Sequence, residues 1–266
     1  MIPKIPYFGY NKSVFFQQMQ DLKISLITVA YNAQNTIEQC LNSVLRQKFN
    51  NVQYIVIDGG STDGTIQIIN KYRDRIDFFV SEPDNGVYDA MNKGIALATG
   101  DIIGTLNADD YYADDDVLHD IAAAFAKQKS SILYGDLDYV DQSGNTVRKW
   151  RSGRYKSGKF NWGWMPPHPT FYCTRNLFEE LGPYKLDYGS AADYELMLRF
   201  IHFNKANVCY LDKVMVKMVT GGISNKSFSN RVKAMRFDLK AMRNNNIWLP
   251  VITMLCKPLR KIVQFF

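Results

Sequence analysis

Acidic and amide side chains recur in the first half of the sequence, each time where a strand is expected to end. Asp58 closes one β-rich run, Asp84 lies in the loop after the next, and Asn107-Ala108-Asp109-Asp110 follows a fourth. Bare carboxylates would repel a phosphate, so a phosphorylated ligand needs a cation between them. Hard carboxylate oxygens suit Mg²⁺ or Mn²⁺. The pattern predicts a metal and diphosphate site, and the alternative is that each cluster only makes a turn.

The elements that must position these residues alternate between strand and helix. Strands are expected at 24–30, 54–57, 76–80 and 102–106, with helices at 37–45, 65–72 and 87–98 between them. Such alternation favours an α/β fold with a mainly parallel central sheet flanked by helices, because each crossover must return to the same end of the sheet. Ligands then bind at the carboxyl ends of the strands.

The pattern changes after residue 110. A helix is expected at 115–127, a β-hairpin at 132–140 and 146–150, an aromatic and glycine-rich loop at 151–169, helices at 175–181 and 193–203, and two short strands around Val208 and Val216. Helices should follow from Phe228 onward. We interpret residues 1–22 as an N-terminal extension, 23–225 as one catalytic-sized domain with halves 23–110 and 111–225, and 226–266 as a basic helical C-terminal tail.

Composition fits one globular unit. The 266 residues are 46% hydrophobic and 14% aromatic, enough to bury one large core. Residues 1–150 carry 13 Lys/Arg against 19 Asp/Glu, whereas residues 151–266 carry 19 against 7. The four cysteines have no metal-binding spacing and are expected to be reduced core thiols. With no apolar signal-peptide core and no apolar run of membrane-spanning length, a cytoplasmic location is expected.

Two common nucleotide-binding motifs are missing from the sequence. It has no GxxxxGK[ST] for a phosphate-binding P-loop and no GxGxxG after the first strand for a dinucleotide fold. Four other segments resemble, in this order and spacing, the family 2 inverting glycosyltransferases of the GT-A nucleotide-diphospho-sugar transferase fold: residues 28–32 (TVAYN), 57–65 (IDGGSTDGT), 91–95 (MNKGI) and 106–110 (LNADD). Residues 81–92 (SEPDNGVYDAMN) further resemble the branch that builds bacterial exopolysaccharides such as colanic acid.

The resemblance implies a nucleoside-diphosphate-sugar donor and a set of residues that contact it. Asp109 would be the metal ligand, for Mn²⁺ or Mg²⁺, that bridges to the diphosphate. The family usually has Asp-x-Asp here; Asn107 replaces the first Asp and can still hydrogen-bond a ribose hydroxyl, so the departure bears on metal affinity more than on metal use. The remaining donor-binding residues implied are Thr28, Tyr31 and Asn32 around the base, Asp58 at the base or ribose, and Asp84 and Lys93 near the donor.

The catalytic base implied by the resemblance lies in the basic half. Asp193, in Ala192-Asp193-Tyr194-Glu195-Leu196, matches the family's Glu-Asp helix start, with Ala192 in place of the usual Glu. Inversion by a single displacement needs one carboxylate to take the proton of the acceptor hydroxyl. The alternative for Asp193 is a helix N-cap.

Three further features are candidates, two of them on the acceptor side and one on the donor side. His168 lies in a Pro-flanked loop that could aim it into the cleft, and the alternative is a surface or hydrogen-bonded histidine. Trp164 and Trp162 could stack on sugar faces or simply pack in the core. Gly221-Gly222-Ile223-Ser224 resembles a family motif that closes over the donor phosphates, with a turn as the alternative.

The C-terminal tail is strongly basic. Residues 226–266 carry nine Lys/Arg and one acid, Asp238, with apolar residues between them. Such a segment could lie in a membrane interface, where each cation near anionic headgroups contributes about 1 kcal/mol. The alternative is a terminal helix packed on the domain. Membrane docking, peripheral on the inner face of the cell membrane, would suit a lipid-linked acceptor such as a polyprenyl-diphosphate-linked saccharide.

The leading functional hypothesis is transfer of a sugar from a nucleoside diphosphate onto a saccharide hydroxyl, with inversion, during surface-polysaccharide assembly. A sugar-nucleotide nucleotidylyltransferase is one alternative, but it would need a Gly-rich, Arg-containing loop where this chain has Tyr31-Asn32-Ala33. A non-catalytic binder of nucleotide sugars or polyanions is another. Nucleic acid is not an expected partner, because the basic residues fall mainly on predicted helices rather than among aromatics on exposed strands.

Overall fold

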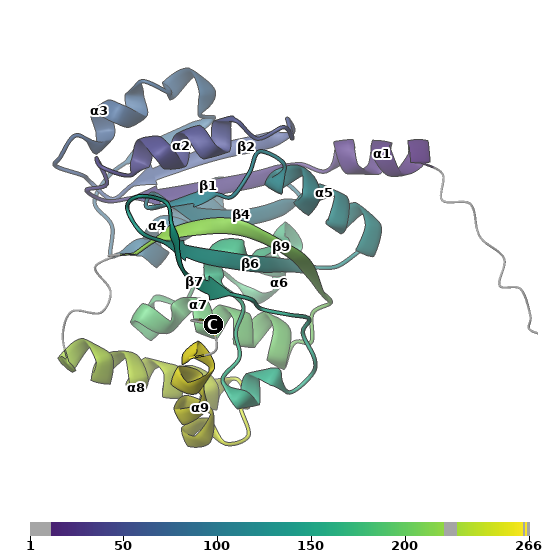
Figure 1. The fold of residues 1–266 in the computed structure, drawn as a ribbon, viewed down its shortest axis with the longest axis vertical. Helices are drawn as coiled ribbons and strands as arrows, with labels where there is room; N and C mark the ends of the chain where they lie inside the picture. Colours follow the sequence, from purple (N-terminus) through teal and green to yellow (C-terminus); the bar gives the residue numbers. More distant parts are fainter. Residues whose placement is uncertain (1–11, 221–227, 263, 265–266) are drawn as a thin grey trace, which may run out of the picture.

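A computed structural model describes residues 12–220, 228–262 and 264. Among these residues, nine strands form one sheet in the order β3-β2-β1-β4-β8-β6-β9-β5, with β7 paired to β6 outside this path. Helices cover both faces of the sheet, and the last two helices lie at the end of the molecule opposite α3 (Figure 1). No helix in the described parts of the chain is long and apolar enough to cross a bilayer.

The parallel part of the sheet agrees with the sequence pattern. It comprises β1 (Ile24–Ala30), β2 (Val52–Asp58), β3 (Phe78–Ser81) and β4 (Ile102–Asn107). The helices between them are α2 (Ile37–Leu45), α3 (Thr65–Asn70) and α4 (Val87–Leu97). Strand β1 is buried along its whole length and pairs in parallel with both β2 and β4. This explains its nearly continuous apolar character.

Beyond β4 the sheet is mixed. It contains β5 (Asp110–Tyr112), β6 (Ile132–Val140), β7 (Thr146–Trp150), β8 (Tyr172–Thr174) and β9 (Val208–Val219), with α5 (Val117–Gln128) before β6. The predicted hairpin is confirmed as the antiparallel pair β6–β7. The prediction of two short strands near Val208 and Val216 is wrong, because β9 is one strand. It continues because it pairs with β6 from Val208 to Val219, and extra residues in β9 are accommodated at two register shifts against β6. Near its end β9 also pairs with β5 on its other side.

Two hydrophobic cores lie on the two faces of the sheet. One packs α2, α3 and α5 against it, together with α1 (Lys12–Asp21), whose Met19 is buried. The second half of the predicted N-terminal extension is therefore a helix that packs on the domain. The other core contains α4, α6 (Arg175–Leu181), α7 (Ala192–Met197) and part of α8 (Phe228–Asn244).

Several short helical segments connect these elements. The predicted helix at 193–203 is split into α7 and a π-helical segment at Leu198–Phe203. Single 3₁₀ turns occupy Arg73–Arg75, Lys159–Trp162, His168–Thr170 and Leu186–Ala191. The last helix, α9 (Pro250–Ile262), packs against the 3₁₀ turn at Lys159–Trp162. A Cβ on Gly163 would lie 2.6 Å from the backbone nitrogen of Lys257, so α9 and this turn are in direct backbone contact.

Helix α4 approaches the centre of the sheet through a glycine. A Cβ at Gly94 would lie 2.4 Å from Cγ2 of Ile27 on β1. This glycine costs helix propensity, about 1 kcal/mol relative to alanine, but it allows the helix to lie close to the strand. The position of α4 on the sheet therefore depends on Gly94.

We predict that Gly94→Ala destabilises the protein by about 1–3 kcal/mol, because overpacking against Ile27 outweighs the gain in helix propensity. Chemical denaturation measures the effect. In a double-mutant cycle with Ile27→Ala, the second substitution should relieve the clash, so the combined loss should be smaller than the sum of the single losses. Additive losses would show that Gly94 and Ile27 do not form this close contact.

Candidate functional site

The carboxyl edge of the parallel strands gathers the predicted donor-binding residues. In the sheet register Asp58 stands beside Ala30 on one side and Ser81 on the other, and Asn107 stands beside Val29. Tyr31, Asn32 and Asp84 follow directly after these strand ends. Residues separated by up to 80 positions in sequence thus share one edge, as expected for a ligand site in a parallel sheet.

Asp58 organises the turn that follows β2. Its Oδ2 accepts hydrogen bonds from the backbone N–H of Gly60 (3.1 Å) and Ser61 (2.9 Å) and from the hydroxyl of Ser81 (2.7 Å). Its Oδ1 accepts one from the Ser61 hydroxyl, and the side chain is fully buried. The structure thus shows Asp58 holding the turn and β3 together, while its contact with a nucleotide stays a prediction.

Asp84 and Lys93 form one unit with the loop between β3 and α4. The Asp84 Oδ1 accepts a hydrogen bond from Gly86 N–H (2.8 Å), and the other carboxylate oxygen would lie 2.4 Å from a Cβ on Gly59. Lys93 bonds to Glu82 (2.8 Å) and to the carbonyl of Pro83 (3.0 Å), and its bond to Glu82 raises the pKa of Lys93. Lys93 therefore fixes the loop that presents Asp84 at the edge.

The residues after β1 differ in accessibility. Tyr31 is 62% exposed and offers a free ring at the edge. Asn32 adopts a left-handed conformation (φ 48°), and its side-chain oxygen accepts a hydrogen bond from Thr62 N–H (2.9 Å). Thr28 is fully buried and its hydroxyl pairs with that of Tyr54 (3.1 Å). Direct contact of Thr28 with a base does not fit this geometry, because its side chain points into the core between the sheet and Cys40 of α2.

At Asn107, Asp109 and Asp110, two carboxyl groups are largely buried and have few partners that would stabilise their charge. The side-chain nitrogen of Asn107 donates to Oδ2 of Asp110 (3.2 Å), but Oδ1 of Asn107 and Oδ1 of Asp110 are buried without a hydrogen-bond partner. Burial raises the pKa of Asp109; burial and the neighbouring Asp109 charge raise that of Asp110 well above its ordinary range. Both carboxyl groups resist ionisation chiefly because burial removes them from water.

This donor set fits a hard divalent cation. Orphaned buried oxygens need a partner, and a cation would supply one while favouring ionisation of both carboxyl groups. Among the described residues no group of three or more His, Cys, Asp or Glu side chains could hold a metal by itself. Mg²⁺ sites commonly combine one or two carboxylates with phosphate oxygens and water, and Asp109 would suit such a site.

Asp193 lies near three aromatic rings, those of Tyr88, His168 and Tyr184. It lies in the first turn of α7, whose N-cap is Ala191, so the N-cap alternative for Asp193 is wrong. Tyr88 of α4 lies close to it: burial raises the pKa of Tyr88, and the Asp193 charge raises it further. Burial lowers the pKa of His168, with the Asp193 charge opposing this effect, and His168 Nε2 lies 2.8 Å from the Tyr184 hydroxyl.

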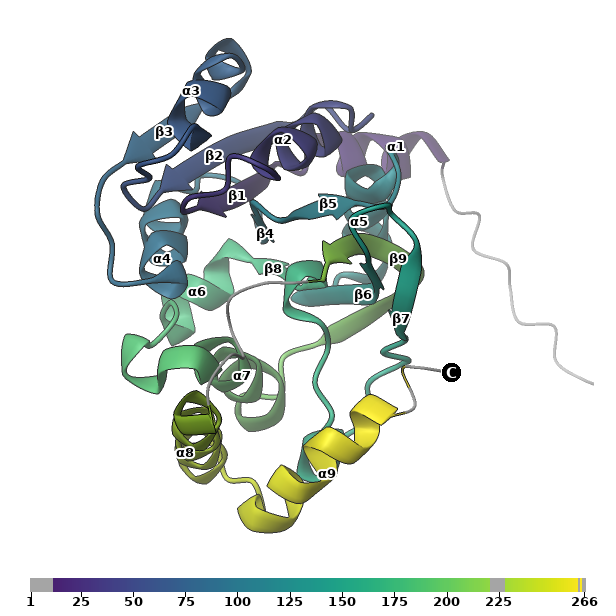
Figure 2. The same ribbon diagram turned by 60° about the vertical axis from the view of Figure 1, so that its left-hand side comes forward.

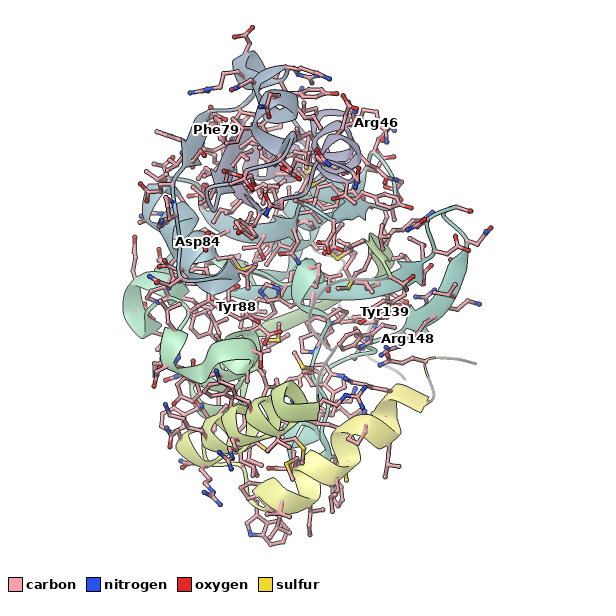
Figure 3. The ribbon with its side chains drawn as sticks, turned by 90° about the vertical axis from the view of Figure 1, so that its left-hand side faces the viewer. Arg46, Phe79, Asp84, Tyr88, Tyr139 and Arg148 are labelled. Carbon is pink, nitrogen blue, oxygen red and sulfur yellow. The ribbon has the colours of Figure 1, made fainter. Side chains whose placement is uncertain are left out.

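Two residues near Asp193 that sequence reasoning did not single out are Tyr88 and Tyr184. Their rings are 5.3 Å apart, and each contacts His168 edge-on. Figure 3 shows Tyr88 below Asp84 on the same side of the molecule. Tyr88 lies in the segment that carried the family resemblance, but Tyr184 gave no signal in sequence because its neighbours come from other elements.

The two tryptophans of the aromatic loop differ. Trp164 is buried, its indole N–H donates to the carbonyl of Ser152 (3.0 Å), and its ring packs on Tyr134 and Phe160. Trp162 is 61% exposed. An acceptor-side role for Trp164 stays a prediction, and Trp162 is the one with a free ring face.

A groove of about 1320 Å³ opens beside Asp193. Its walls come from the end of β7, the loop around Trp162, and helices α8 and α9 (Figure 2). The predicted basic tail therefore packs on the domain at residues 228–262, and α9 forms one wall of the groove next to the predicted base. The Gly221-Gly222-Ile223-Ser224 motif lies outside the described residues.

The buried Asp110 predicts a specific pH dependence. An aspartate in an unfolded chain ionises near pH 3.9, at about its ordinary pKa. Because the native carboxyl keeps its proton to higher pH, the native state binds more protons, and the free energy of unfolding falls as pH rises from about 4 towards the native pKa. In metal-free buffer, Asp110→Asn should therefore be more stable than wild type at pH 7.5 and should lose less stability between pH 4.5 and 7.5.

Urea unfolding midpoints across this pH range test the prediction. Asp74→Asn, at an exposed aspartate, is the matched control and should run parallel to wild type. If Asp110→Asn also ran parallel to wild type, Asp110 would not be the carboxyl group that titrates at raised pH.

Comparison with known proteins agrees with this arrangement. The glycosyl transferase family 2 model matches residues 25–182. A PGL/p-HBAD biosynthesis glycosyltransferase of Mycobacterium bovis is 32% identical over 207 residues, covering 76% of this chain and 78% of its own. An uncharacterized glycosyltransferase of Mycobacterium tuberculosis is 32% identical over 186 residues, covering 66% and 68%.

Solved structures show the same fold. Residues 1–349 of S. aureus TarS superpose with a TM-score of 0.67 at 22% identity, covering 92% of this chain and 72% of that one. A mannosyltransferase from Pyrobaculum calidifontis, solved with GDP-Man and Mn²⁺, gives a TM-score of 0.64 at 16% identity, covering 89% and 72%. The expected GT-A fold is thus confirmed, and the chain belongs to glycosyl transferase family 2.

Proposed function

We propose that this glycosyltransferase moves a sugar from a nucleoside diphosphate to a hydroxyl of a lipid-linked saccharide, with inversion, in surface-polysaccharide or glycolipid assembly. The observation that carries the proposal is the uncompensated Asp109–Asp110 site at the carboxyl edge, joined through α4 to Asp193 beside a large groove. The Asp109–Asp110 site would bind a cation and a diphosphate, and Asp193 would present its carboxylate to an acceptor.

The donor would lie along the carboxyl edge of β1, β2 and β4. Tyr31 is exposed there for contact with a base, and Asn32, Asp58 and Asp84 border the same edge. Solved relatives support this assignment, because TarS was solved with UDP and with UDP-GlcNAc, and the archaeal mannosyltransferase with GDP-Man.

Asp109 would hold Mn²⁺ or Mg²⁺, with Asn107 and Asp110 behind it. When bound, the cation supplies positive charge that stabilises the departing nucleoside diphosphate. The two raised carboxyl pKa values support this assignment, since a cation would favour the ionised carboxylates that it binds.

Asp193 would act as the base. In a single displacement the acceptor hydroxyl forms a bond to the anomeric carbon as the bond to the diphosphate breaks. The hydroxyl proton goes to Asp193, and the bonding electrons leave with the diphosphate. His168 and Tyr184 would position the acceptor beside Asp193, because burial keeps the imidazole neutral and the tyrosine hydroxyl holds it in place.

Exposed apolar residues on and before α9 support peripheral membrane association. Trp248 is 80% exposed and Val251 55% exposed, with Ile252, Leu255 and Leu259 also exposed along the helix. Their spacing places them on one face, near Arg260 and Lys261. An interfacial helix combines these two features. Since α9 also packs on the domain, point substitutions test this role better than truncation.

Two conservative variants separate the proposed roles. Asp193→Asn should lower transfer about 10²–10⁴-fold, because the general base is lost, while nucleotide-sugar binding in Mn²⁺ stays intact. Asp109→Asn should lose the Mn²⁺-dependent stabilisation by nucleotide sugar. Thermal shift across UDP- and GDP-sugars with and without Mn²⁺ measures binding, and release of nucleoside diphosphate measures turnover.

Asp74→Asn is the control for both assays and should behave as wild type. Near wild-type turnover of Asp193→Asn would rule out its role as base. Binding of nucleotide sugar without metal-dependent release of the diphosphate by wild type would instead favour a non-catalytic binder.

For membrane association we predict that Trp248→Ser combined with Val251→Ser lowers binding to phosphatidylglycerol-containing vesicles by about tenfold or more, because each side chain contributes apolar area. Co-sedimentation with vesicles measures the effect. Leu186→Ser, at an exposed leucine away from α9, should bind as wild type. Equal binding by all three proteins would exclude docking through this face.

A further inference from the structure

The groove beside Asp193 has a strongly positive lining. Of the described side chains that border it, six are Lys or Arg and only two are carboxylates. The cations are Lys149, Arg151, Arg231, Lys257, Arg260 and Lys261, and the carboxylates are Asp193 and Asp238. Arg151 is already paired with Asp136 and Asp138. The remaining excess of positive charge faces the groove, and an anion would be attracted to it.

Lys257 of α9 is held against both α7 and α8. Its ammonium lies 3.6 Å from the centre of the Tyr194 ring, and Tyr194 adjoins Asp193 in sequence. A 2.7 Å ion pair with Asp238 of α8 holds it there, with only 15% of the Lys257 side chain exposed. Lys257 is therefore a fixed cation in the wall of the groove that Asp193 also borders.

Lys261 lies one helical turn further along α9. Desolvation lowers the pKa of Lys261, and the nearby Lys257 and Arg148 charges lower it further. Arg148 of β7 stacks over Tyr139 at 4.5 Å and donates to the side-chain oxygen of Gln264 (2.8 Å). Figure 3 shows Tyr139 and Arg148 close to the end of α9. The two lysines of α9 thus repel each other at the wall of the groove, and an anion bound between them would relieve that repulsion.

Apolar side chains border the same groove. Leu255 and Leu259 of α9 are 60% and 62% exposed, and Met235 faces the groove from α8 and is 45% exposed. Exposed apolar side chains that adjoin a cationic site mark a surface for an amphipathic partner.

We propose that this groove binds the phosphate groups and the first part of the lipid chain of an isoprenoid-diphosphate-linked acceptor. The phosphates would lie between Lys257, Lys261 and Arg231, and the chain along Leu255 and Leu259. The assignment rests on the proposed function, since it places the sugar next to Asp193.

Two other anionic occupants fit the groove less well. A phosphate-rich polymer would satisfy the cations but would have no use for Leu255 and Leu259 beside them. A flat bilayer surface could not reach Lys257, which lies in the wall with its side chain mostly covered. A single molecule with both a diphosphate and an apolar chain satisfies both parts of the lining.

Farnesyl diphosphate, inorganic pyrophosphate and farnesol are soluble probes for this site. Titration calorimetry without divalent metal, below the micelle concentration, should show farnesyl diphosphate binding at least tenfold tighter than either of the others. Lys261→Gln with Arg231→Gln should weaken farnesyl diphosphate and pyrophosphate alike. Leu255→Ser with Leu259→Ser should weaken farnesyl diphosphate alone.

The matched controls are Lys127→Gln, an exposed helix cation on α5, and Leu186→Ser, and both should bind as wild type. Equal affinities for pyrophosphate and farnesyl diphosphate would overturn the proposal in favour of a polyanion site. Binding to anionic vesicles without binding to soluble farnesyl diphosphate would overturn it in favour of headgroup contacts.

Hydrolysis of the nucleotide sugar by water separates this proposal from the proposed function. Mn²⁺-dependent hydrolysis should be unchanged in both groove double variants, because the donor edge is untouched. If the wild type hydrolyses the donor but the groove variants bind farnesyl diphosphate as tightly as wild type, only the groove assignment is overturned. Absence of donor turnover in wild type would overturn the proposed function itself.

Discussion

The structure of the site depends on one pair of hydrogen bonds between its two halves. The side chain of Asn92, on α4, donates to the carbonyl of Tyr184 (2.8 Å) and accepts from its N–H (3.0 Å). On its other side α4 contacts β1 through Gly94. The same helix follows the Asp84 loop and carries Tyr88 towards Asp193. A single rigid element therefore fixes the donor edge relative to the proposed base, and fixed relative geometry is what a displacement between two substrates requires.

The loop that carries Tyr184 is also held from the opposite side. The buried Arg199 donates to the carbonyls of Gly182 (2.8 Å) and Pro183 (2.9 Å) and pairs with Glu195 (3.0 Å) on the helix that bears Asp193. A buried ion pair contributes little net stability unless its remaining hydrogen bonds are satisfied, as they are here by backbone carbonyls. The role of this pair is to fix the positions of α7 and the loop that carries Tyr184 relative to each other.

The acidic first half and the basic second half of the chain each form a charged site in the structure. At the donor edge Asp109 and Asp110 are desolvated, and the Asp109 charge disfavours ionisation of Asp110, so a cation would stabilise both carboxylates. In the groove Lys257 and Lys261 outnumber their carboxylate partners, so that site is prepared for an anion. The acidic first half and the basic second half of the sequence predicted this division, but not its location. Charge counts give the sign of a partner, whereas desolvation by neighbouring elements decides which groups need one.

The sequence by itself determined the elements with strong local patterns and the family. Strand β1 and helix α6 match the predicted bounds, because a run buried on both faces and a helical apolar spacing are properties of the local chain. The continuity of β9, the burial of Thr28 and the packing of α1 and α9 on the domain required the tertiary structure, since each depends on a partner distant in sequence. So did the cluster around Asp193 and the groove beside it. These sites form from side chains that only the packing of α4, α7, α8 and α9 brings within reach of one another.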